Sequence, residues 1–341
     1  MKSLPPDRTL TRACLAAGVL LSAGCATSAP GPSGAPSAQG APSSSARPAI
    51  SAFPSAPAEI RVAVTVDDLP RHGPEVPGMN RLAIHRALLD IFARHRMTQV
   101  YGFVNAGRVQ PGDEAALRAW VEAGQPLGNH TAHHPDIGKV GIEAYLADVD
   151  AGEPLLAQLL GPGKERVWKV FRYPFLWQGT DLPSRLALRT GLVDRGYRIA
   201  EVTIDFDDWA YNPPYARCLA GGHPEDIAAL EEMFLDSGVE QLRWADDTLR
   251  RLVGRPVPHV LLLHAGVFDT RILDRLFTAY EKAGVTWIPL DEALADPVYQ
   301  REPDPPRSWR GELPLQMLRA RQITGFLYPA RPDPLLEQFC R

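Results

Sequence analysis

The chain has 341 residues, of which 45% are hydrophobic and 22% are charged, and its formal net charge is −4. This composition is that of a globular protein with a sizeable core, and the length suits one large domain or two ordinary ones. The nearly balanced charge gives no sign of the basic patch or stripe that nucleic-acid-binding proteins usually show, so we expect no nucleic-acid partner.

The first residues resemble an export signal. A positive region is followed by an apolar stretch, residues 13–21, that is too short to span a bilayer, and by small residues before Cys25. Leu-Ser-Ala-Gly-Cys resembles a bacterial lipobox, although Ser22 stands where the pattern prefers Leu. We therefore expect residues 1–25 to be a signal peptide, Cys25 to be lipidated, and the exported protein to be anchored to a membrane of the cell envelope, facing the periplasm or the exterior. Cleavage to a free secreted protein and an uncleaved leader are the alternatives.

Composition also divides the rest of the chain. Residues 26–58 are almost entirely Ala, Pro, Ser and Gly, which cannot bury apolar surface and predict a flexible tether. Residues 59–297 read as the folded domain, and residues 298–341 as a Pro- and Arg-rich tail that packs irregularly on its surface. Cys218 and Cys340 could pair in an oxidising compartment, but the sequence leaves a disulfide and two free thiols equally open.

Strand-like and helix-like segments alternate from residue 60 onward. Apolar runs predict strands over 60–66, 98–104, 126–130, 168–173, 198–204, 259–263 and 285–290. Helical spacing of apolar residues predicts helices over 80–96, 113–123, 142–160, 186–195, 224–253 (with a break near Gly238) and 271–283. About seven β/α units predict a parallel sheet or barrel with helices outside, in which groups that follow the strands meet on one face.

The segment 210–258 is longer than a minimal β/α connection. Its place after a polar motif makes it a candidate lid or wall of a substrate groove. The alternative, which the helical spacing favours, is a helical hairpin that packs on the barrel.

Two motifs supply candidate metal ligands. Asp67 and Asp68 end the first predicted strand, where a bend of the backbone can bring both carboxylates to one site, and His130 and His134 follow the third strand. In a short helix-like turn, the i, i+4 spacing places both imidazoles on one side, and His133 should point elsewhere. One carboxylate and two imidazoles form a common ligand set for a catalytic divalent metal, and the second carboxylate can act as a base. Taken alone, each motif could equally be a solvated turn or a polar loop.

Three later motifs follow other strands. Arg172 ends the fourth strand, Asp205, Asp207 and Asp208 follow the fifth, and His264 ends the strongly apolar sixth. Alone, Arg172 reads as a structural ion-pair partner, and His264 could equally be a packed histidine at a strand end or a functional one.

The ordered set Thr-x-Asp-Asp, His-Thr-x-x-His-Pro, Arg-x-Pro-Phe, Asp-x-x-Asp-Trp and Leu-x-His resembles the five motifs of the polysaccharide deacetylases. This family is also called carbohydrate esterase family 4, or the NodB-homology group. The resemblance covers roughly residues 60–293 and implies an α/β fold, a distorted (β/α)7 barrel. Leu69, Phe175 and Ala265 depart from the usual pattern, which affects the fit of the substrate more than the chemistry.

The resemblance also implies roles for individual residues. The metal ligands would be Asp68, His130 and His134, holding Zn²⁺ or else Co²⁺, Ni²⁺ or Mn²⁺. The catalytic roles would fall on Asp67 as the base, Arg172 as its orienting partner, and His264 as the acid that Asp208 holds. Trp209 and Leu263 would wall the acetyl pocket, and the backbone N–H of Tyr173 would donate to the oxyanion.

The implied function is metal-dependent removal of N-acetyl groups from the hexosamine units of an envelope or extracellular polysaccharide. A metal-dependent O-esterase or non-sugar amidase on the same fold remains open, because an ester or another amide meets the same metal and base. A glycan-binding relative without turnover is a further alternative, although such a protein would need neither a base nor an acid.

Overall fold

The structure is a computed structural model that describes residues 59–300, 303–305 and 310–341. The predicted signal peptide, the lipidation site at Cys25 and the predicted tether lie outside these residues. The described part belongs to one compact unit, Ser55–Arg341. Within it, none of the helices combines the length and the apolar character that a bilayer crossing requires.

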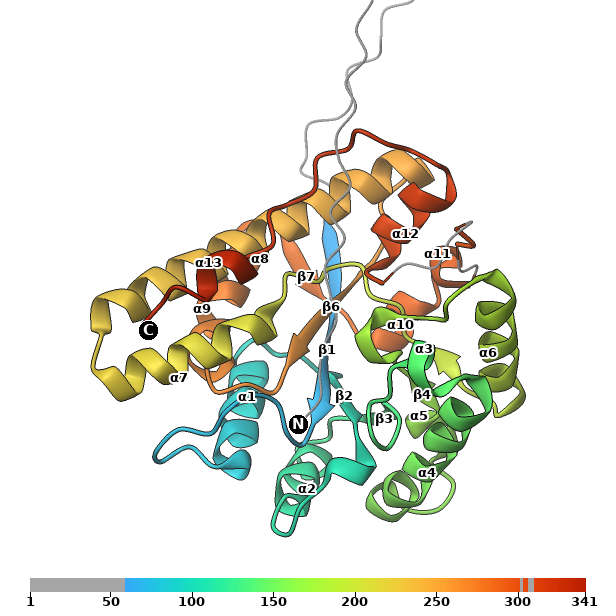
Figure 1. Cartoon of the computed structure of the whole chain (residues 1–341), viewed down its shortest axis with the longest axis horizontal. Helices are drawn as coiled ribbons and strands as arrows, with labels where there is room; N and C mark the ends of the chain where they lie inside the picture. The colour runs from blue at the N-terminus through green and yellow to red at the C-terminus, as the bar shows by residue number, and fades with distance from the viewer. Residues whose placement is uncertain (1–58, 301–302, 306–309) are drawn as a thin grey trace, which may run out of the picture. The chain divides into compact units, whose positions relative to one another are not determined.

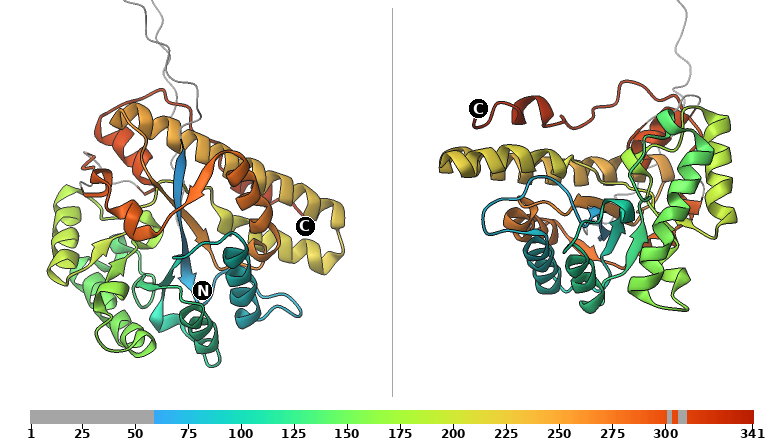
Figure 2. Two further views of the ribbon diagram at one scale, coloured as in Figure 1. Left: turned by 180° about the vertical axis from the view of Figure 1, so that it is seen from behind. Right: turned by 60° about the horizontal axis from the view of Figure 1, so that its bottom comes forward.

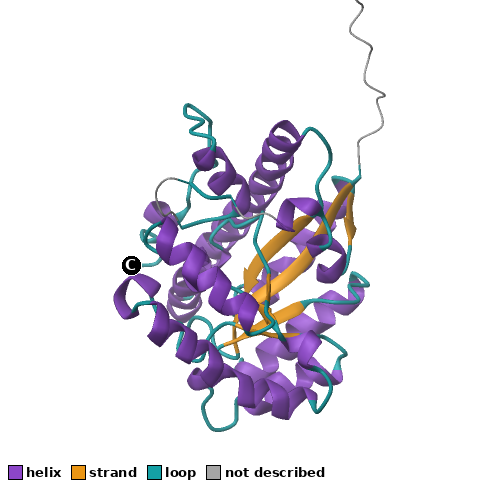
Figure 3. Ribbon diagram, turned by 90° about the vertical axis from the view of Figure 1, so that its right-hand side faces the viewer, coloured by secondary structure: helices purple, strands orange, loops and turns teal. Residues whose placement is uncertain are grey.

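Seven strands form one sheet, and every pair of neighbours among them is parallel. The strands lie together inside a layer of helices (Figure 3). Each begins or ends within a few residues of a predicted strand. Their bounds are β1 (Ile60–Leu69), β2 (Tyr101–Val104), β3 (Leu127–Asn129), β4 (Val170–Phe171), β5 (Arg198–Ile199), β6 (His259–His264) and β7 (Val285–Trp287).

The sheet curves back on itself to form a barrel. From β5 it runs through β4, β3, β2 and β1 to β6. Ile204, a few residues after β5, then pairs with Leu261 of β6, and the N–H of Leu262 donates to the carbonyl of Ile204 at 3.0 Å. Strand β7 pairs only with the start of β1, at Ile60 to Val62, and so distorts the ring. The predicted distorted (β/α)7 barrel is confirmed.

The strands alternate between two faces, as the two-residue period of a strand requires. In β1, Val62, Val64 and Val66 pack outward into the main core. Ala63 faces the opposite side, in an inner cluster that includes Phe103. Side chains in register with Ala63 therefore point into the barrel, and this face leads to the site.

Helices cover the outside of the barrel (Figure 1). Helices α4 and α8 have the predicted bounds, α7 is an additional helix within residues 210–258, and the others lie close to predicted helices or form short turns. They are α1 (Arg81–Arg94), α2 (Glu114–Glu122), α3 (Ile137–Val140), α4 (Ile142–Leu160), α5 (Glu165–Trp168), α6 (Leu182–Asp194), α7 (Asn212–Gly221), α8 (Pro224–Val253), α9 (Asp269–Lys282) and α10 (Leu290–Leu294).

Residues 210–258 form a helical hairpin, α7 and α8, as the favoured alternative predicts (Figures 1 and 2). The predicted break near Gly238 is wrong, because α8 continues through it. A Cβ at Gly238 would lie 2.7 Å from Leu276, so glycine serves here to let α9 approach, and Tyr280 donates to its carbonyl at 2.6 Å. The hairpin contributes no side chain to the cavity described below.

A disulfide joins α7 to the end of the chain. Cys218 and Cys340 are bonded, with their Cα atoms 5.0 Å apart, which decides between the two alternatives that the sequence left open. Arg217 adds a hydrogen bond to the carbonyl of Phe339, at 3.1 Å. The last residues are thereby fastened to the hairpin.

The tail after Asp296 is more ordered and more deeply packed than predicted. It contains α11 (Pro297–Gln300), α12 (Leu313–Ala320) and α13 (Asp333–Leu336). Glu312 and Leu313 are fully buried, and the N–H of Leu313 donates to the carbonyl of Val202 at 2.7 Å. The expectation of an irregular surface segment is wrong for this part, because the tail caps one end of the barrel.

Glu312 makes stability depend on pH. Its carboxylate accepts from Tyr328 at 2.8 Å and lies 3.5 Å from Arg331. Burial raises its pKa to about 7 despite the charge of Arg331. Because the folded state then holds this proton more tightly than the unfolded state, stability should fall as pH rises from the unfolded pKa to about 7.

Glu312→Gln should flatten this dependence, which we expect to amount to at most about 3 kcal/mol. Urea unfolding at several pH values measures it. The exposed Glu337→Gln is the matched control and should keep the dependence of the unchanged protein. An unchanged pH slope in Glu312→Gln would contradict the assignment.

Candidate active site

A bend at the end of β1 brings two adjacent carboxylates to one place. Asp67 follows Ala63 and Thr65 on the inward face, so Asp68 would point outward if the strand continued. Instead Asp68 has φ +62°, a left-handed conformation that is uncommon outside glycine, and the pairing with β2 shifts register between Val66 and Leu69. The predicted bend is therefore present, and both side chains line the same cavity.

Asp67 is held by a buried arginine from β4. Arg172 is fully buried and donates from Nη1 to both oxygens of Asp67 at 3.1 Å. It is fixed in turn by hydrogen bonds to Thr65 at 3.1 Å and to the carbonyl of Ala200 at 2.7 Å. Burial raises the pKa of Asp67 to about 6, although the charge of Arg172 opposes the rise. The result is an oriented carboxylate with more basic character than usual.

Asp68 faces two imidazoles at distances that suit a shared cation. Its Oδ1 lies 3.6 Å from Nε2 of His130 and 3.5 Å from Nε2 of His134, too far for hydrogen bonds, and this buried oxygen has no hydrogen-bond partner among the described residues. Two ligands of one tetrahedral zinc ion lie roughly 3.4 Å apart, given bonds of about 2.1 Å. The three residues therefore fit a divalent metal.

The protonation of His130 also suits a ligand. Its Nδ1 lies 2.8 Å from the carbonyl oxygen of Arg172, which can only accept, so Nδ1 carries the proton and Nε2 keeps its lone pair. Burial lowers the pKa of His130 well below its usual range and also lowers the pKa of His134. Both rings are thus neutral at neutral pH, as metal ligation requires.

The histidine loop differs from the predicted helix-like turn. Thr131 and His134 have φ +65° and +56°, and no helix forms between them. The rings of His130 and His134 nevertheless meet, with centroids 4.8 Å apart. The side chain of Asn129 fixes the loop by accepting from the N–H of Thr131 at 2.8 Å. His133 points elsewhere, as predicted, and pairs with Asp148 at 2.5 Å.

His264 is held opposite these groups by Asp208. The two join through Nδ1 of His264 and Oδ1 of Asp208 at 2.8 Å, and the backbone N–H of His264 donates to the other oxygen at 2.6 Å. Burial alone would lower the pKa of His264, but the charge and hydrogen bond of Asp208 outweigh it and raise the pKa to about 10. His264 is therefore a protonated imidazole with Nε2 available as a donor.

These groups line a cavity of about 520 Å³. Tyr173 and Trp209 are among the residues that line it. The prediction for Leu263 is wrong: this residue packs outward into the main core, and Leu262 lines the cavity instead. The two-residue period of β6 explains the correction, since Leu262 shares the inward face with His264. In the motif Leu-x-His, the leucine is Leu262.

Several residues at the site were not predicted. His72 donates from Nδ1 to Oδ2 of Asp68 at 3.0 Å, and Arg108 lies 3.8 Å from Oδ1. His72 follows Asp68 by four residues, and this spacing was the available signal. From the tail, Arg310 and Arg331 line the cavity, and no local pattern in that Pro-rich stretch indicates it.

Arg310 is placed by aromatic side chains of the loop after β4. Its guanidinium lies 4.3 Å from the ring centroid of Trp177 and 5.2 Å from that of Phe175, and it pairs with Asp136 at 3.0 Å. Arg331 pairs with Asp207 at 2.7 Å. The charges of Arg310 and Arg331 are both neutralised by carboxylates. The tail therefore affects the shape of the cavity more than its net charge.

Residues 55–187 match the family model described as polysaccharide deacetylase. No curated protein matches the chain. Among solved structures, the chain is similar to a family 4 acetyl xylan esterase from Clostridium thermocellum in complex with a cobalt ion, with 17% identity, 69% of this chain and 90% of that chain covered, and a TM-score of 0.46.

Two further structures are similar to the same extent. A mutant of a peptidoglycan deacetylase from Bacillus subtilis is 17% identical, with 70% of this chain and 93% of that chain covered and a TM-score of 0.46. A mutant, with restored enzymatic activity, of a carbohydrate esterase family 4 pseudoenzyme from Bacillus anthracis is 16% identical, with 70% and 69% covered and a TM-score of 0.48.

The ring of parallel strands with its outer helices defines a distorted (β/α)7 barrel. Residues 55–187 are similar to the polysaccharide deacetylase family, and this stretch includes Asp67, Asp68, His130, His134 and Arg172.

Proposed function

We propose that the protein is a metal-dependent N-deacetylase that acts on the hexosamine units of an envelope or extracellular polysaccharide. The observation that supports the proposal is that three kinds of functional group line one cavity. These are the ligand set of Asp68 with two neutral imidazoles, the buried base Asp67, and the imidazolium His264. A protein that only bound glycans would need neither the base nor the acid.

The residues divide the reaction between them. A divalent cation held by Asp68, His130 and His134 would polarise the acyl carbonyl and lower the pKa of water. Asp67 accepts the proton of the attacking water, with Arg172 keeping its carboxylate aligned. The backbone N–H of Tyr173 is the proposed donor to the oxyanion.

His264 supplies the proton that the leaving group needs. An amide nitrogen departs poorly unless it is protonated, and Nε2 of His264 can deliver that proton while Asp208 holds Nδ1. The products are acetate and a free amino sugar. The same groups would hydrolyse an acetyl ester or a non-sugar amide, so the identity of the substrate is the finer part of the proposal.

Acetate release tests the proposal. The purified protein would be assayed on peptidoglycan fragments and on oligomers of N-acetylglucosamine, with added zinc or cobalt and with a chelator. We expect metal-dependent release that the chelator abolishes, with zinc as the preferred metal among those that Asp–His–His sites accept. An acetylated xylan in parallel tests the O-esterase alternative. Protein with metal bound that releases no acetate from any of these would overturn the proposal.

We also propose export and membrane anchoring through Cys25. The lipobox-like sequence supports it, and the disulfide between Cys218 and Cys340 suits an oxidising compartment. Cys25→Ser should move the protein from the membrane fraction to the soluble fraction and abolish incorporation of labelled fatty acid. Cys14→Ser, which changes a cysteine within the signal, is the control. Membrane retention of Cys25→Ser would contradict the anchor.

A further inference from the structure

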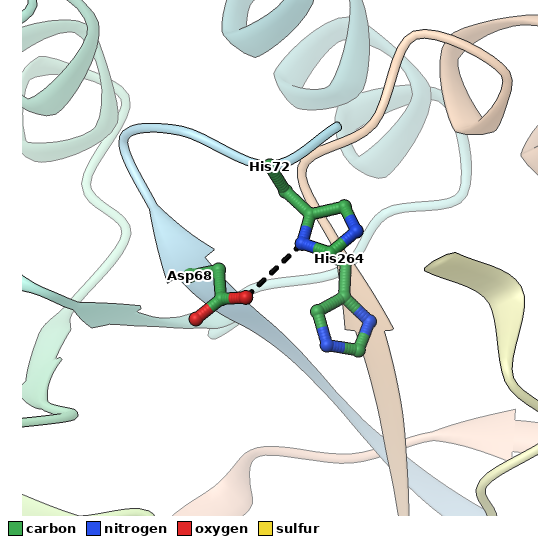
Figure 4. A group of neighbouring side chains, drawn as sticks. All are labelled: Asp68, His72 and His264. Atoms are coloured by element: carbon green, nitrogen blue, oxygen red, sulfur yellow. Dashed lines mark hydrogen bonds and ion pairs between the residues drawn. The ribbon is translucent and has the colours of Figure 1, made fainter. Parts of the chain in front are cut away.

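His72 brings a second set of metal-ligating atoms to the active site. Asp68, His72 and His264 each offer one ligand atom, and these atoms all lie within 4.8 Å of one another. Figure 4 shows the two imidazoles on the same side of Asp68, one above the other. Their ring centroids are 4.5 Å apart. The proposed mechanism gives His72 no part, although its side chain is only 16% exposed.

Each carboxylate oxygen of Asp68 faces a different set of candidate ligands. Oδ1 faces His130 and His134, while Oδ2 faces Nδ1 of His72 at 3.0 Å. A carboxylate that presents one oxygen to each side is the geometry of a bridging ligand. In sites with two metal ions, the ions lie about 3.5–4 Å apart.

His264 can join the second set without losing its partner. Its Nδ1 is engaged by Asp208 at 2.8 Å, which leaves Nε2 as the ligand atom. Histidines that ligate a metal through one nitrogen usually donate from the other to a carboxylate or carbonyl, as His264 does here. The carboxylates of Asp67 and Asp208 lie beside this set and would offset part of the charge of a second cation.

We propose that Asp68, His72 and His264 form a second, weaker divalent-metal site that shares Asp68 with the first, and that its occupation stops turnover. The second site is weaker because its cation shares the carboxylate of Asp68 with the first cation and is repelled by that cation. Binding there must also replace the hydrogen bond between His72 and Asp68. It stops turnover because a metal on Nε2 of His264 removes the proton donor. Two imidazoles and a carboxylate favour zinc, cobalt or nickel.

Metal titration of the metal-free full chain tests the site. With zinc or cobalt, calorimetry should show two binding events of different strength, and the visible spectrum of bound cobalt should change again with the second. Acetate release should rise with the first equivalent and fall with the second. Only this last readout rests on the proposed function, so a chain without deacetylase activity can still confirm or refute the second site.

His72→Asn removes the imidazole while keeping an N–H that can donate to Asp68. We expect it to retain the first event, to weaken the second by about 10–100-fold or more, and to relieve inhibition by excess metal. His72→Phe, which keeps a ring beside His264, serves if the first variant folds poorly. His133→Ala removes an exposed histidine nearby and should keep both events. A single event in the unchanged chain, or a second event that survives both changes at His72, would overturn the proposal.

Discussion

Asp67→Asn should lower the turnover number by about a thousandfold, in the range typical for loss of a general base. The amide cannot take the proton of the attacking water, whereas the three groups that face the metal position are unchanged. Metal content by elemental analysis should therefore stay at that of the unchanged protein. Acetate release under saturating substrate measures the loss.

Asp67→Asn also leaves the buried charge of Arg172 without its carboxylate partner, so the stability of the variant must be measured together with its turnover. Arg172 keeps its hydrogen bonds to Thr65 and to the carbonyl of Ala200, which limits the cost to about 3 kcal/mol or less. Asp150→Asn, at an exposed ion pair with Arg195, is the matched carboxylate-to-amide control and should change neither turnover nor metal content. Folded Asp67→Asn protein with near-normal turnover would remove Asp67 as the base.

His130→Ala should lose metal and turnover together. Nε2 of His130 faces Oδ1 of Asp68, and its other nitrogen donates to the carbonyl of Arg172, so the change leaves only Asp68 and His134 of the first ligand set. We expect metal affinity to fall by more than the roughly 10–100-fold that loss of an outer-shell partner causes. Competition with a coloured chelator measures the affinity.

His133→Ala is the control for His130→Ala, since it lies in the same loop but points to Asp148 and solvent. It should bind metal as the unchanged protein does. Tight metal binding by folded His130→Ala protein would count against the ligand assignment.

The strands were predictable because each is a compact apolar run, and α4 because its apolar residues keep a helical period. Closure of the ring through Ile204 was not predictable, nor was the displacement of β7 to the start of β1. Both depend on pairings between segments far apart in the chain, which no local pattern records. The packing of the tail on the barrel was not predicted for a related reason. The burial of Glu312 depends on contacts with residues distant in sequence, which the local sequence does not show.

The convergence of the motifs was predictable because all strands run parallel, so their polar ends meet at one edge. The details depended on individual backbone angles. Asp68 and His134 reach the cavity because their backbones adopt left-handed conformations, which nothing in the sequence indicates. Leu262 could have been predicted, because side chains two residues apart in a strand point to the same face and His264 points inward. For His72, the only signal in the sequence was its spacing of four residues from Asp68.

The groups to which we assign the reaction and the wall formed by the tail come from separate stretches of the chain. The reacting groups lie at strand ends between Asp67 and His264, while Arg310, Gly311, Leu315 and Arg331 follow the last strand. If the proposed function holds, exchanging the final stretch for that of a relative should alter which substrate is accepted without rebuilding the chemistry. During synthesis, the same arrangement means that the binding surface is complete only when the final residues have emerged and folded back.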